Sequence, residues 1–441
     1  MRKTNLLVRF VLIVAILISL VLSYLIWTNN QRYERKSDTE STVTTALITN
    51  QQALSQVFLP TEVVKVDQKG NQQLVYNHKE NLVLEIRKLM ANWSYRSSHR
   101  STKRYADLMA LNGSVQLIYA DQLSTQLFGE VAKQDSLKSA TTDHAFDRII
   151  FNLTGDLDHV YFLDDRTQSV WESRVSKADA DPVATLINKC DFKVKVTQET
   201  LSGQPRLFFS DSVKLQPYSY LINRRNETTY ISALMSSDNN ANVESRESGG
   251  QTVYYGGGSY HNQLIVDHRS DQLEFVDNSR TTIPESLNRL QESGFTMLNS
   301  IGNPLTDIRY YDADNTKKTI AFRSFVEGFP IFQQSDFGAV KITFSRSGSH
   351  IKFSSRVLQV PVPAANGQVT LPATATILQK LIAAGYRKGE IQDLVVGYQW
   401  ITDQEEADIV DLKPTYYAKI NDRWQTYQTW INDKTQTEAT N

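Results

Sequence analysis

Residues 148–175, RIIFNLTGDLDHVYFLDDRTQSVWESRV, carry the clearest strand pattern of the chain. The apolar runs RIIFNL, HVYFLDD and VWESRV are short, rich in β-branched and aromatic residues, and separated by polar turns such as Asp165-Arg166-Thr167. Asp181 and Pro182 then fit the N-cap and first residue of a helix, where proline is tolerated because its missing N–H would be unpaired anyway. Residues 143–250 are therefore predicted to form a central α+β domain.

The preceding residues, 57–142, predict a mixed N-terminal α+β domain. Apolar and polar residues alternate on both sides of Lys69-Gly70-Asn71, which is typical of a β-hairpin. Residues 82–93 repeat apolar side chains at helical spacing and favour an amphipathic helix. The apolar run at residues 115–120 favours a strand.

A polar segment, residues 236–258, separates these patterns from the last part of the chain. It is rich in Ser, Asn and Gly and is interpreted as a linker or a long loop. Residues 251–432 again alternate helix and strand patterns, so they are predicted to form a C-terminal α+β domain. Residues 433–441 are interpreted as a tail.

Two stretches of this last domain resemble each other. One helix is predicted to open at Thr282-Ile283-Pro284 and to end at Gly294; the other opens at Thr370-Leu371-Pro372 and ends at Gly385. Two extended runs come after each helix, and a helix with a hairpin must bury one face of each against the other. Either the domain contains an internal repeat, or two helices share common start and stop signals.

The N-terminus carries a long apolar run. Residues 10–27, FVLIVAILISLVLSYLIW, contain no charge, and at about 1.5 Å of rise per residue they span roughly the 30 Å core of a bilayer. A cleaved signal peptide is the alternative, but its apolar core is usually shorter, and Tyr24-Leu25-Ile26-Trp27 stands where small residues precede a cleavage site. We therefore predict a cytoplasmic N-terminus at residues 1–9, a transmembrane helix at 10–27 and a stalk at 28–56.

Basic residues flank this helix on both sides, so the positive-inside rule orients it only weakly. A first apolar segment with a basic start and no second segment behaves as a signal-anchor that exports the rest of the chain. Cys190 is the single cysteine of the 441 residues, and an exported chain without disulfides favours a Gram-positive cell surface. The formal net charge of −1, with both signs interspersed, predicts no nucleic-acid-binding face.

The expected fold is therefore α+β: a single N-terminal transmembrane helix followed by a multidomain extracytoplasmic part with antiparallel sheets and packed helices. With 40% hydrophobic and 22% charged residues, that part is able to bury a substantial core. The expected location is the cell membrane, with the C-terminal bulk extracellular.

Patterns that would indicate catalysis or metal binding are weak. Residues 349–352 match the S-x-x-K pattern of Ser/Lys acylases, but the supporting S-D-N and K-T-G elements are missing. Residues 312–315 space oxygen ligands as a calcium loop does, yet the later glycine and glutamate are absent, so a hairpin turn is the better interpretation. His261 and His268 lack metal-site spacing, and Cys190 is interpreted as buried filler. The sequence predicts no catalytic, cofactor-binding or metal-binding residue, and no enzyme.

Within the apolar run, Ala15, Ser19 and Ser23 fall at i, i+4 and i+8. Small residues at this spacing let a second helix approach closely. They are the candidate transmembrane packing face, and the partner would be another membrane protein. The alternative is that Ala and Ser are ordinary residues of such helices.

The order and spacing of four segments resemble the YycH family of low-GC Gram-positive bacteria over essentially the whole chain. The segments are SYLIWT (23–28), LSQVFLPTEVV (54–64), RIIFNL (148–153) and FRSFVEGFPIF (322–332). The resemblance implies a multidomain α+β external part with no catalytic residues and no cofactor.

It also implies a role for the protein. A YycH protein, with its sister protein YycI, binds the essential sensor histidine kinase WalK (YycG), partly through transmembrane helices, and tunes signalling that controls cell-wall metabolism. The direction of this regulation differs among species. Two alternatives from other classes are a wall-anchored hydrolase and a module that binds a wall polymer or peptide, for which the aromatic-rich residues 398–430 are a candidate surface.

Overall fold

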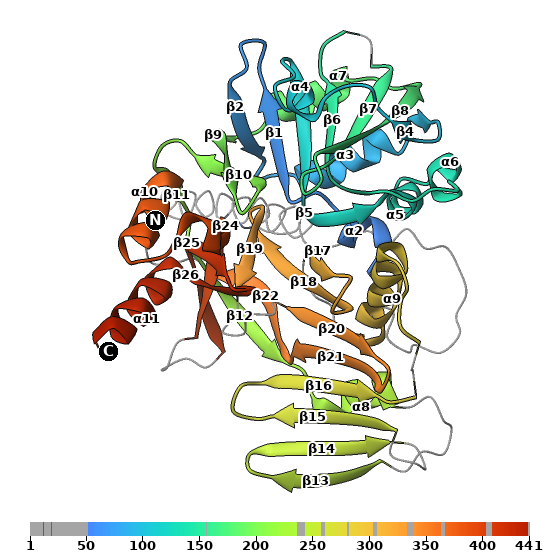
Figure 1. Cartoon of the computed structure of the whole chain (residues 1–441). Helices are drawn as coiled ribbons and strands as arrows, with labels where there is room; N and C mark the ends of the chain where they lie inside the picture. The colour runs from blue at the N-terminus through green and yellow to red at the C-terminus, as the bar shows by residue number, and fades with distance from the viewer. Residues whose placement is uncertain are drawn as a thin grey trace, which may run out of the picture. The chain divides into compact units, whose positions relative to one another are not determined.

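The computed structural model describes residues 52–439 apart from 156, 236–242, 257–260, 280–281, 303–306, 333–338, 363–366 and 403–407, together with Leu12 and Ser19. Residues 50–441 form one compact unit, which contains all the elements discussed below (Figure 1). Leu12 and Ser19 are helical and exposed. The predicted transmembrane helix and its packing face otherwise lie outside the described residues, and among the described residues no helix is long and apolar enough to cross a membrane.

The N-terminal half, defined here as residues 52–209, is built on an antiparallel sheet of ten described strands. Their order is β10-β9-β2-β1-β5-β6-β7-β8-β3, with β4 also paired to β8. The strands are β1 (Glu62–Val66), β2 (Gln72–Tyr76), β3 (Ser94–Tyr95), β4 (His99–Arg100), β5 (Ser114–Ser124), β6 (Ala145–Asn152), β7 (His159–Asp164), β8 (Ser169–Ser176), β9 (Phe192–Leu201) and β10 (Gln204–Phe209). The helices are α2 (Leu54–Val57), α3 (Leu82–Met90), α4 (Tyr105–Met109), α5 (Thr125–Val131), α6 (Asp135–Lys138) and α7 (Asp181–Asn188).

Several predictions from sequence are confirmed in this half. The segment 148–175 forms β6, β7 and β8, and the hairpin β1–β2 turns at Gly70, which has a φ of +84°. Helix α7 begins close to the predicted position, although Ala180 rather than Asp181 is its N-cap. Strands β5 and β6 pair in register although they lie on either side of the domain boundary predicted at 142/143.

Side-chain alternation gives this sheet two different faces. On β6, Ile149 and Phe151 belong to the hydrophobic core that also holds buried residues of α3, α5 and α7. Ile150 belongs instead to a small cluster with Leu108 of α4 on the opposite face. Arg148 shares that opposite face, because alternate residues of a strand point the same way. The second face therefore carries both apolar and charged side chains.

The C-terminal half, residues 213–439, is built on a second sheet of fourteen strands, counted over the described residues. Its order is β13-β14-β15-β16-β21-β20-β18-β19-β24-β25-β12-β22, with β17 on β18 and β26 on β25, while β11 pairs with β23 alone. The strands are β11 (Val213–Leu215), β12 (Tyr218–Arg224), β13 (Glu244–Ser248), β14 (Gln251–Gly256), β15 (Asn262–Asp267), β16 (Gln272–Asp277), β17 (Ile308–Asp314), β18 (Thr319–Val326), β19 (Phe329–Phe332), β20 (Val340–Ser345), β21 (Gly348–Ser354), β22 (Arg356–Val362), β23 (Val369–Leu371), β24 (Ile391–Thr402), β25 (Ile409–Ile420) and β26 (Arg423–Thr426). The helices are α8 (Glu227–Met235), α9 (Leu287–Ser300), α10 (Thr374–Ala383), a short 3₁₀ helix (Lys388–Glu390) and α11 (Tyr427–Ala439).

Helix α9 corrects one prediction. It begins after its N-cap Ser286 and continues through Gly294 to Ser300, so Gly294 does not end it. A Cβ at Gly294 would lie 2.6 Å from Cγ2 of Ile320 on β18. The glycine is therefore needed for close packing of the helix on the sheet. In α10, by contrast, Gly385 follows the last turn with a φ of +97°, as predicted for a helix end.

Two other predictions change in detail. The described part of the proposed linker 236–258 contains β13 and β14, which pair in register as an antiparallel hairpin. Helix α10 begins at Thr374, and not at residues 370–372, which lie largely in β23. Both predicted helices are nevertheless followed by a hairpin, β17–β18 after α9 and β24–β25 after α10.

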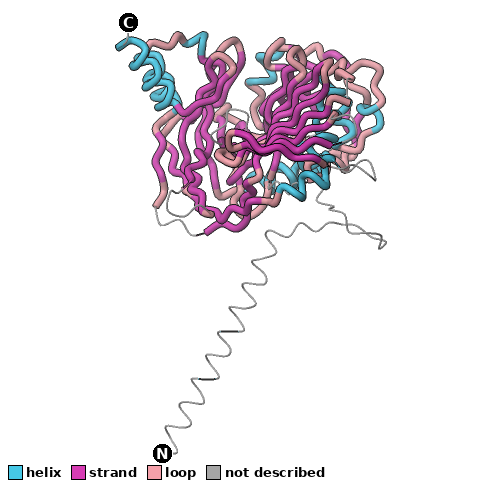
Figure 2. The backbone as a smooth tube through the Cα atoms, turned by 90° about the horizontal axis from the view of Figure 1, so that it is seen from below, coloured by secondary structure: helices cyan, strands magenta, loops and turns pink. Residues whose placement is uncertain are grey.

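Two hydrophobic cores join the halves. In the first, Phe58 of the N-terminal half contacts the rings of Phe295, Tyr310 and Phe322, with centroid distances of 5.3 to 6.3 Å. The second contains Val64 and Leu74 together with Phe329 and Ile331. Figure 2 shows the strands as two groups, and these cores connect the groups.

Candidate functional site

A cavity of about 690 Å³ lies between the two halves. The N-terminal half lines it with residues of β1, β2, β5, β6 and β10, and the C-terminal half with residues of β17, β18, β19, β20, β24 and β25. This volume is within the range of small-molecule sites in proteins, about 300 to 1,000 Å³. The cavity is therefore the candidate functional site.

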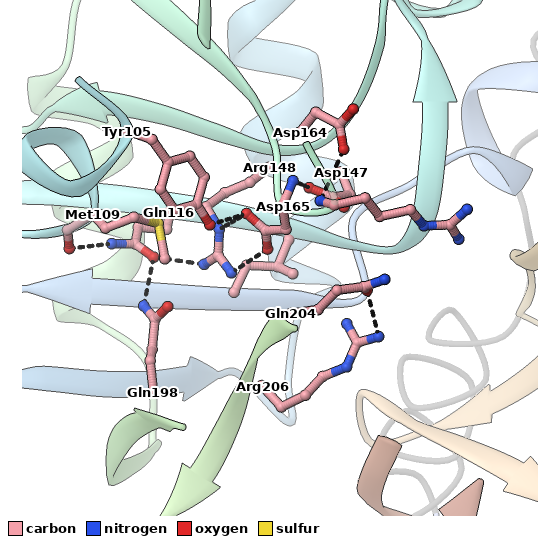
Figure 3. A network of polar contacts seen from close by, with 12 residues as sticks. Tyr105, Met109, Gln116, Asp147, Arg148, Asp164, Asp165, Gln198, Gln204 and Arg206 are labelled. Carbon is pink, nitrogen blue, oxygen red and sulfur yellow. Dashed lines mark hydrogen bonds and ion pairs between the residues drawn. The ribbon is translucent and has the colours of Figure 1, made fainter. Parts of the chain in front are cut away.

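Arg148 is the centre of a buried polar network in its wall (Figure 3). Its guanidinium donates to both carboxylate oxygens of Asp165, at 3.3 and 2.7 Å, and to Oε1 of Gln116 at 2.7 Å. The hydroxyl of Tyr105 donates to Asp165 at 2.6 Å, and the Asp165 N–H donates to Asp147 at 2.9 Å. Arg148 and Asp165 are 1% and 2% exposed. Because the two side chains satisfy each other inside the protein, this pair builds the wall and is not free to bind a ligand.

Asp147 lies beside this pair and is also buried. Burial first, and then the charge of Asp165, raise the pKa of Asp147 well above its usual range. One buried cation thus serves two neighbouring carboxyl groups, and the protonated form of Asp147 is favoured.

Asp121 connects the two halves of the protein in the wall of the cavity. Its Oδ2 accepts a hydrogen bond of 2.8 Å from the N–H of Ala313 on β17, and its Oδ1 forms an ion pair with Arg166. Burial, followed by the charge of Asp312, raises the pKa of Asp121 to about 6. The protonation state of this contact therefore changes near pH 6.

Two arginines of the C-terminal half complete the wall. Arg309 is held by both oxygens of Asp307, at 3.0 and 2.9 Å, and donates to the carbonyl of Pro60 in the N-terminal half at 3.3 Å. Arg323 lies over the ring of Phe332 at 4.1 Å and over Tyr311 at 4.8 Å. Arg309 in turn lies over the ring of Phe325 at 4.7 Å. Both arginine side chains are 2% exposed or less, so each is held against aromatic rings inside the protein.

Glu62 opens the first strand and faces the cavity, where Asp393 of β24 is a neighbouring carboxylate. Asp393 forms an ion pair with Nε of Arg206 at 3.3 Å. Burial first, and then the charge of Asp393, raise the pKa of Glu62 from 4.5 to about 7. Arg148 and Arg206 partly offset this rise.

Glu62 makes the stability of the folded chain depend on pH. Since its pKa is higher in the folded chain than its ordinary value of 4.5, its favourable contribution is complete below that value and is lost as pH rises to about 7. We expect Glu62→Gln, which cannot ionise, to gain about 1–3 kcal/mol of unfolding free energy over the wild-type chain between about pH 5 and pH 8. Urea unfolding at both pH values measures this. Glu85→Gln, on the outer surface of α3, is the control, and its unfolding free energy relative to the wild-type chain is expected to be the same at both pH values. If the unfolding free energy of Glu62→Gln relative to the wild-type chain is also the same at both pH values, the prediction is wrong.

Of the patterns that the sequence singled out, residues 312–315 and part of the aromatic-rich run 398–430 line the cavity, whereas Ser349, Lys352 and Cys190 do not. Ser349 is buried and points to the core face of β21, whereas Lys352 is exposed on the other face and pairs with Glu274 at 3.3 Å. Residues three apart in a strand point to opposite faces, so Ser349 and Lys352 do not form a Ser/Lys pair.

The remaining candidates are explained by local structure. Asp314 accepts hydrogen bonds of 2.8 Å from the N–H groups of Thr316 and Lys317, which confirms the hairpin turn. Cys190 is buried, its thiol donates to the carbonyl of Leu186 at 3.4 Å, and burial raises its pKa to about 11. Over the described ranges, no group of three or more His, Cys, Asp or Glu residues is placed to hold a metal ion.

The predictions from sequence missed the charged residues of the cavity. Three arginines stand in strands whose other residues are mostly apolar and expected to be buried. They are Arg148 within RIIF, and Arg309 and Arg323. A charge at a position expected to be buried needs a partner. That signal was present, but the partners come from distant strands and the sequence does not name them.

The chain is thus an α+β protein whose two halves share hydrophobic cores and enclose a polar cavity. Family models match it as the YycH protein N-terminal domain over residues 7–191 and the YycH protein C-terminal domain over residues 205–434. The chain belongs to the YycH family.

Comparison of folds agrees with this assignment. The crystal structure of YycH from Bacillus subtilis superposes with a TM-score of 0.67 at 15% sequence identity, covering 86% of this chain and 97% of the other. An uncharacterized protein from Eubacterium rectale covers 49% of this chain and 82% of its own at 12% identity, and its TM-score of 0.30 carries no argument. No curated protein matches the chain by sequence.

Proposed function

We propose that this protein is a non-enzymatic accessory regulator of the sensor histidine kinase WalK (YycG), acting with a YycI-like partner to control cell-wall metabolism. The observation that carries the proposal is the match of both YycH domain models, over residues 7–191 and 205–434. The YycH family is associated with the WalK system in general. The separation of Ser349 from Lys352 on β21 removes the nucleophile pattern that favoured a hydrolase.

The proposed topology places the N-terminus in the cytoplasm, a single membrane-spanning helix at residues 10–27 and the two halves outside the cell. Its support is the uncharged apolar run of the sequence. In this arrangement, the stripe of Ala15, Ser19 and Ser23 is the face on which the helix of the kinase or of the YycI-like protein packs.

The test is co-purification of the full-length chain with WalK and the YycI-like protein from the membrane of its own host. Replacing Ala15, Ser19 and Ser23 together by leucine is expected to reduce the co-purified kinase by tenfold or more, because bulky side chains keep two helix backbones apart. Ile13→Leu with Val21→Leu, outside this stripe, is the matched control and is expected to change nothing. Unchanged recovery in the triple variant would remove this face from the proposal, and absence of the kinase with the wild-type chain would remove the proposal itself.

A further inference from the structure

Strand β13 forms one end of the fourteen-stranded sheet of the C-terminal half (Figure 1). Among the described strands it pairs with β14 alone, and all five of its side chains, Glu244 to Ser248, are exposed. Its pairing with β14 is continuous, without a register shift. The side of β13 that faces away from β14, called here its outer edge, therefore presents backbone groups to which a further strand is able to pair.

Other end strands of the two sheets carry features that prevent such pairing. Strand β10 contains Pro205 and β22 contains Pro361, and proline lacks the N–H that a neighbouring strand needs. Strand β3 has only two residues. Strand β13 has neither a proline nor a bulge. Its charged side chains are its only feature of the kind that protects sheet edges, so their arrangement decides whether a strand pairs there.

The turn that follows β13 determines which backbone groups face the outer edge. Gly249-Gly250 is a two-residue hairpin loop with φ values of +63° and +85°, and it joins Ser248 to its partner Gln251. In such a hairpin these two residues exchange their backbone hydrogen bonds, and the pattern then alternates along the strand. The N–H and C=O groups of Ser245 and Glu247 therefore point to the outer edge.

We propose that two copies of this chain pair through the outer edges of their β13 strands, antiparallel about a two-fold axis at Ser245. Ser245 then faces Ser245 of the second copy, and both have backbone groups that point to the outer edge. On either side of the axis, Glu244 faces the second copy's Arg246. These pairs lie at positions where facing Cα atoms are about 4.5 Å apart and side chains come closest. Arg246 lies over the ring of Tyr255 at 5.5 Å, which places both charged residues on one face of the sheet.

The charges select this register over its neighbours. A two-fold axis brings together residues whose side chains point to the same face, so the register changes in steps that keep this alternation. One step in one direction sets Arg246 opposite Arg246, and one step in the other sets Glu244 opposite Glu244. Like charges directly opposite each other are destabilising, whereas opposite charges stabilise. The edge of β13 is thus complementary to itself, and this pairing goes beyond the proposed regulatory function and does not depend on it.

Analytical ultracentrifugation of the full-length chain in detergent tests the inference through the dissociation constant of the dimer. Arg246→Glu sets glutamates opposite each other at both pairs, and we expect it to raise this constant at least tenfold. Adding Glu244→Arg to Arg246→Glu exchanges the two charges and is expected to restore the dimer. Glu247→Arg, an equally exposed charge reversal outside these pairs, is the matched control and is expected to change nothing. Association through the predicted transmembrane helix would not respond to Arg246→Glu.

Crosslinking with a short bismaleimide tests the register. The single native cysteine, Cys190, is buried, so crosslinks are expected only at an introduced thiol. Ser245→Cys is expected to give a crosslinked dimer, whereas two copies of Ser248→Cys lie six residues, about 20 Å, apart along the strands and are expected to give none. The inference is overturned if the wild-type chain is monomeric at high micromolar concentration, if Arg246→Glu dimerises as the wild type does, or if both cysteine variants crosslink equally. Kinase co-purification is measured separately, so failure here leaves the proposed function standing.

Discussion

Replacing Arg148 by methionine is expected to lower the free energy of unfolding by about 3–5 kcal/mol. The substitution keeps most of the side-chain volume but removes the cation that binds both oxygens of Asp165, a residue that is 2% exposed. Asp165 would then stay buried with the Tyr105 hydroxyl as a side-chain donor, and Gln116 would lose one partner. Urea unfolding followed by tryptophan fluorescence measures the change.

The matched control adds Asp165→Asn to Arg148→Met. Because the neutral amide does not leave a buried charge, the double variant is expected to recover about 1–2 kcal/mol of the loss. A double variant that is no more stable than Arg148→Met alone would mean that the loss comes from packing and not from an uncompensated carboxylate.

Replacing Phe58 by alanine is expected to cost about 3–5 kcal/mol, the second large effect. The ring is fully buried and packs on Phe295, Tyr310 and Phe322 of the C-terminal half. Its loss leaves a cavity at the junction of the two halves, since strands on both sides limit how far the site can collapse. The midpoint of urea unfolding, followed by fluorescence and by circular dichroism, measures the effect.

Phe58→Leu keeps much of the volume and is expected to cost less than about 1.5 kcal/mol. Both probes are expected to report one shifted transition, because residues of both halves belong to the same core. An early, separate transition of one half in Phe58→Ala would contradict the view that the two family domains are stabilised as one unit.

The contact of Phe58 also concerns the path from the predicted stalk. The end of that stalk, residues 52–56, belongs to the compact unit, and Asn299 of α9 binds the backbone of Gln52 through hydrogen bonds of 2.8 and 3.2 Å. The chain that leaves the stalk therefore contacts the C-terminal half before it enters the first strand. Any force on the stalk would reach α9 as well as β1.

Much of the fold was predicted where the pattern is local. The strands β6, β7 and β8, the hairpin at Gly70 and the helix end at Gly385 depend on side-chain alternation and on backbone conformations that glycine adopts readily. The wrong prediction at Gly294 concerns a residue whose role is not local. Its glycine serves a contact with Ile320, which is close in space and distant in sequence.

The sequence by itself determined the α+β class and the resemblance to the YycH family, because periodicity, turn residues and segment order are properties of neighbouring residues. Only the tertiary structure decided that Phe58 and α9 join the two halves, that Ser349 and Lys352 face apart, and that Glu62 and Asp393 share one cavity. The reason is physical: partners of a buried charge are selected by strand order and register, and these bring together residues that lie far apart along the chain.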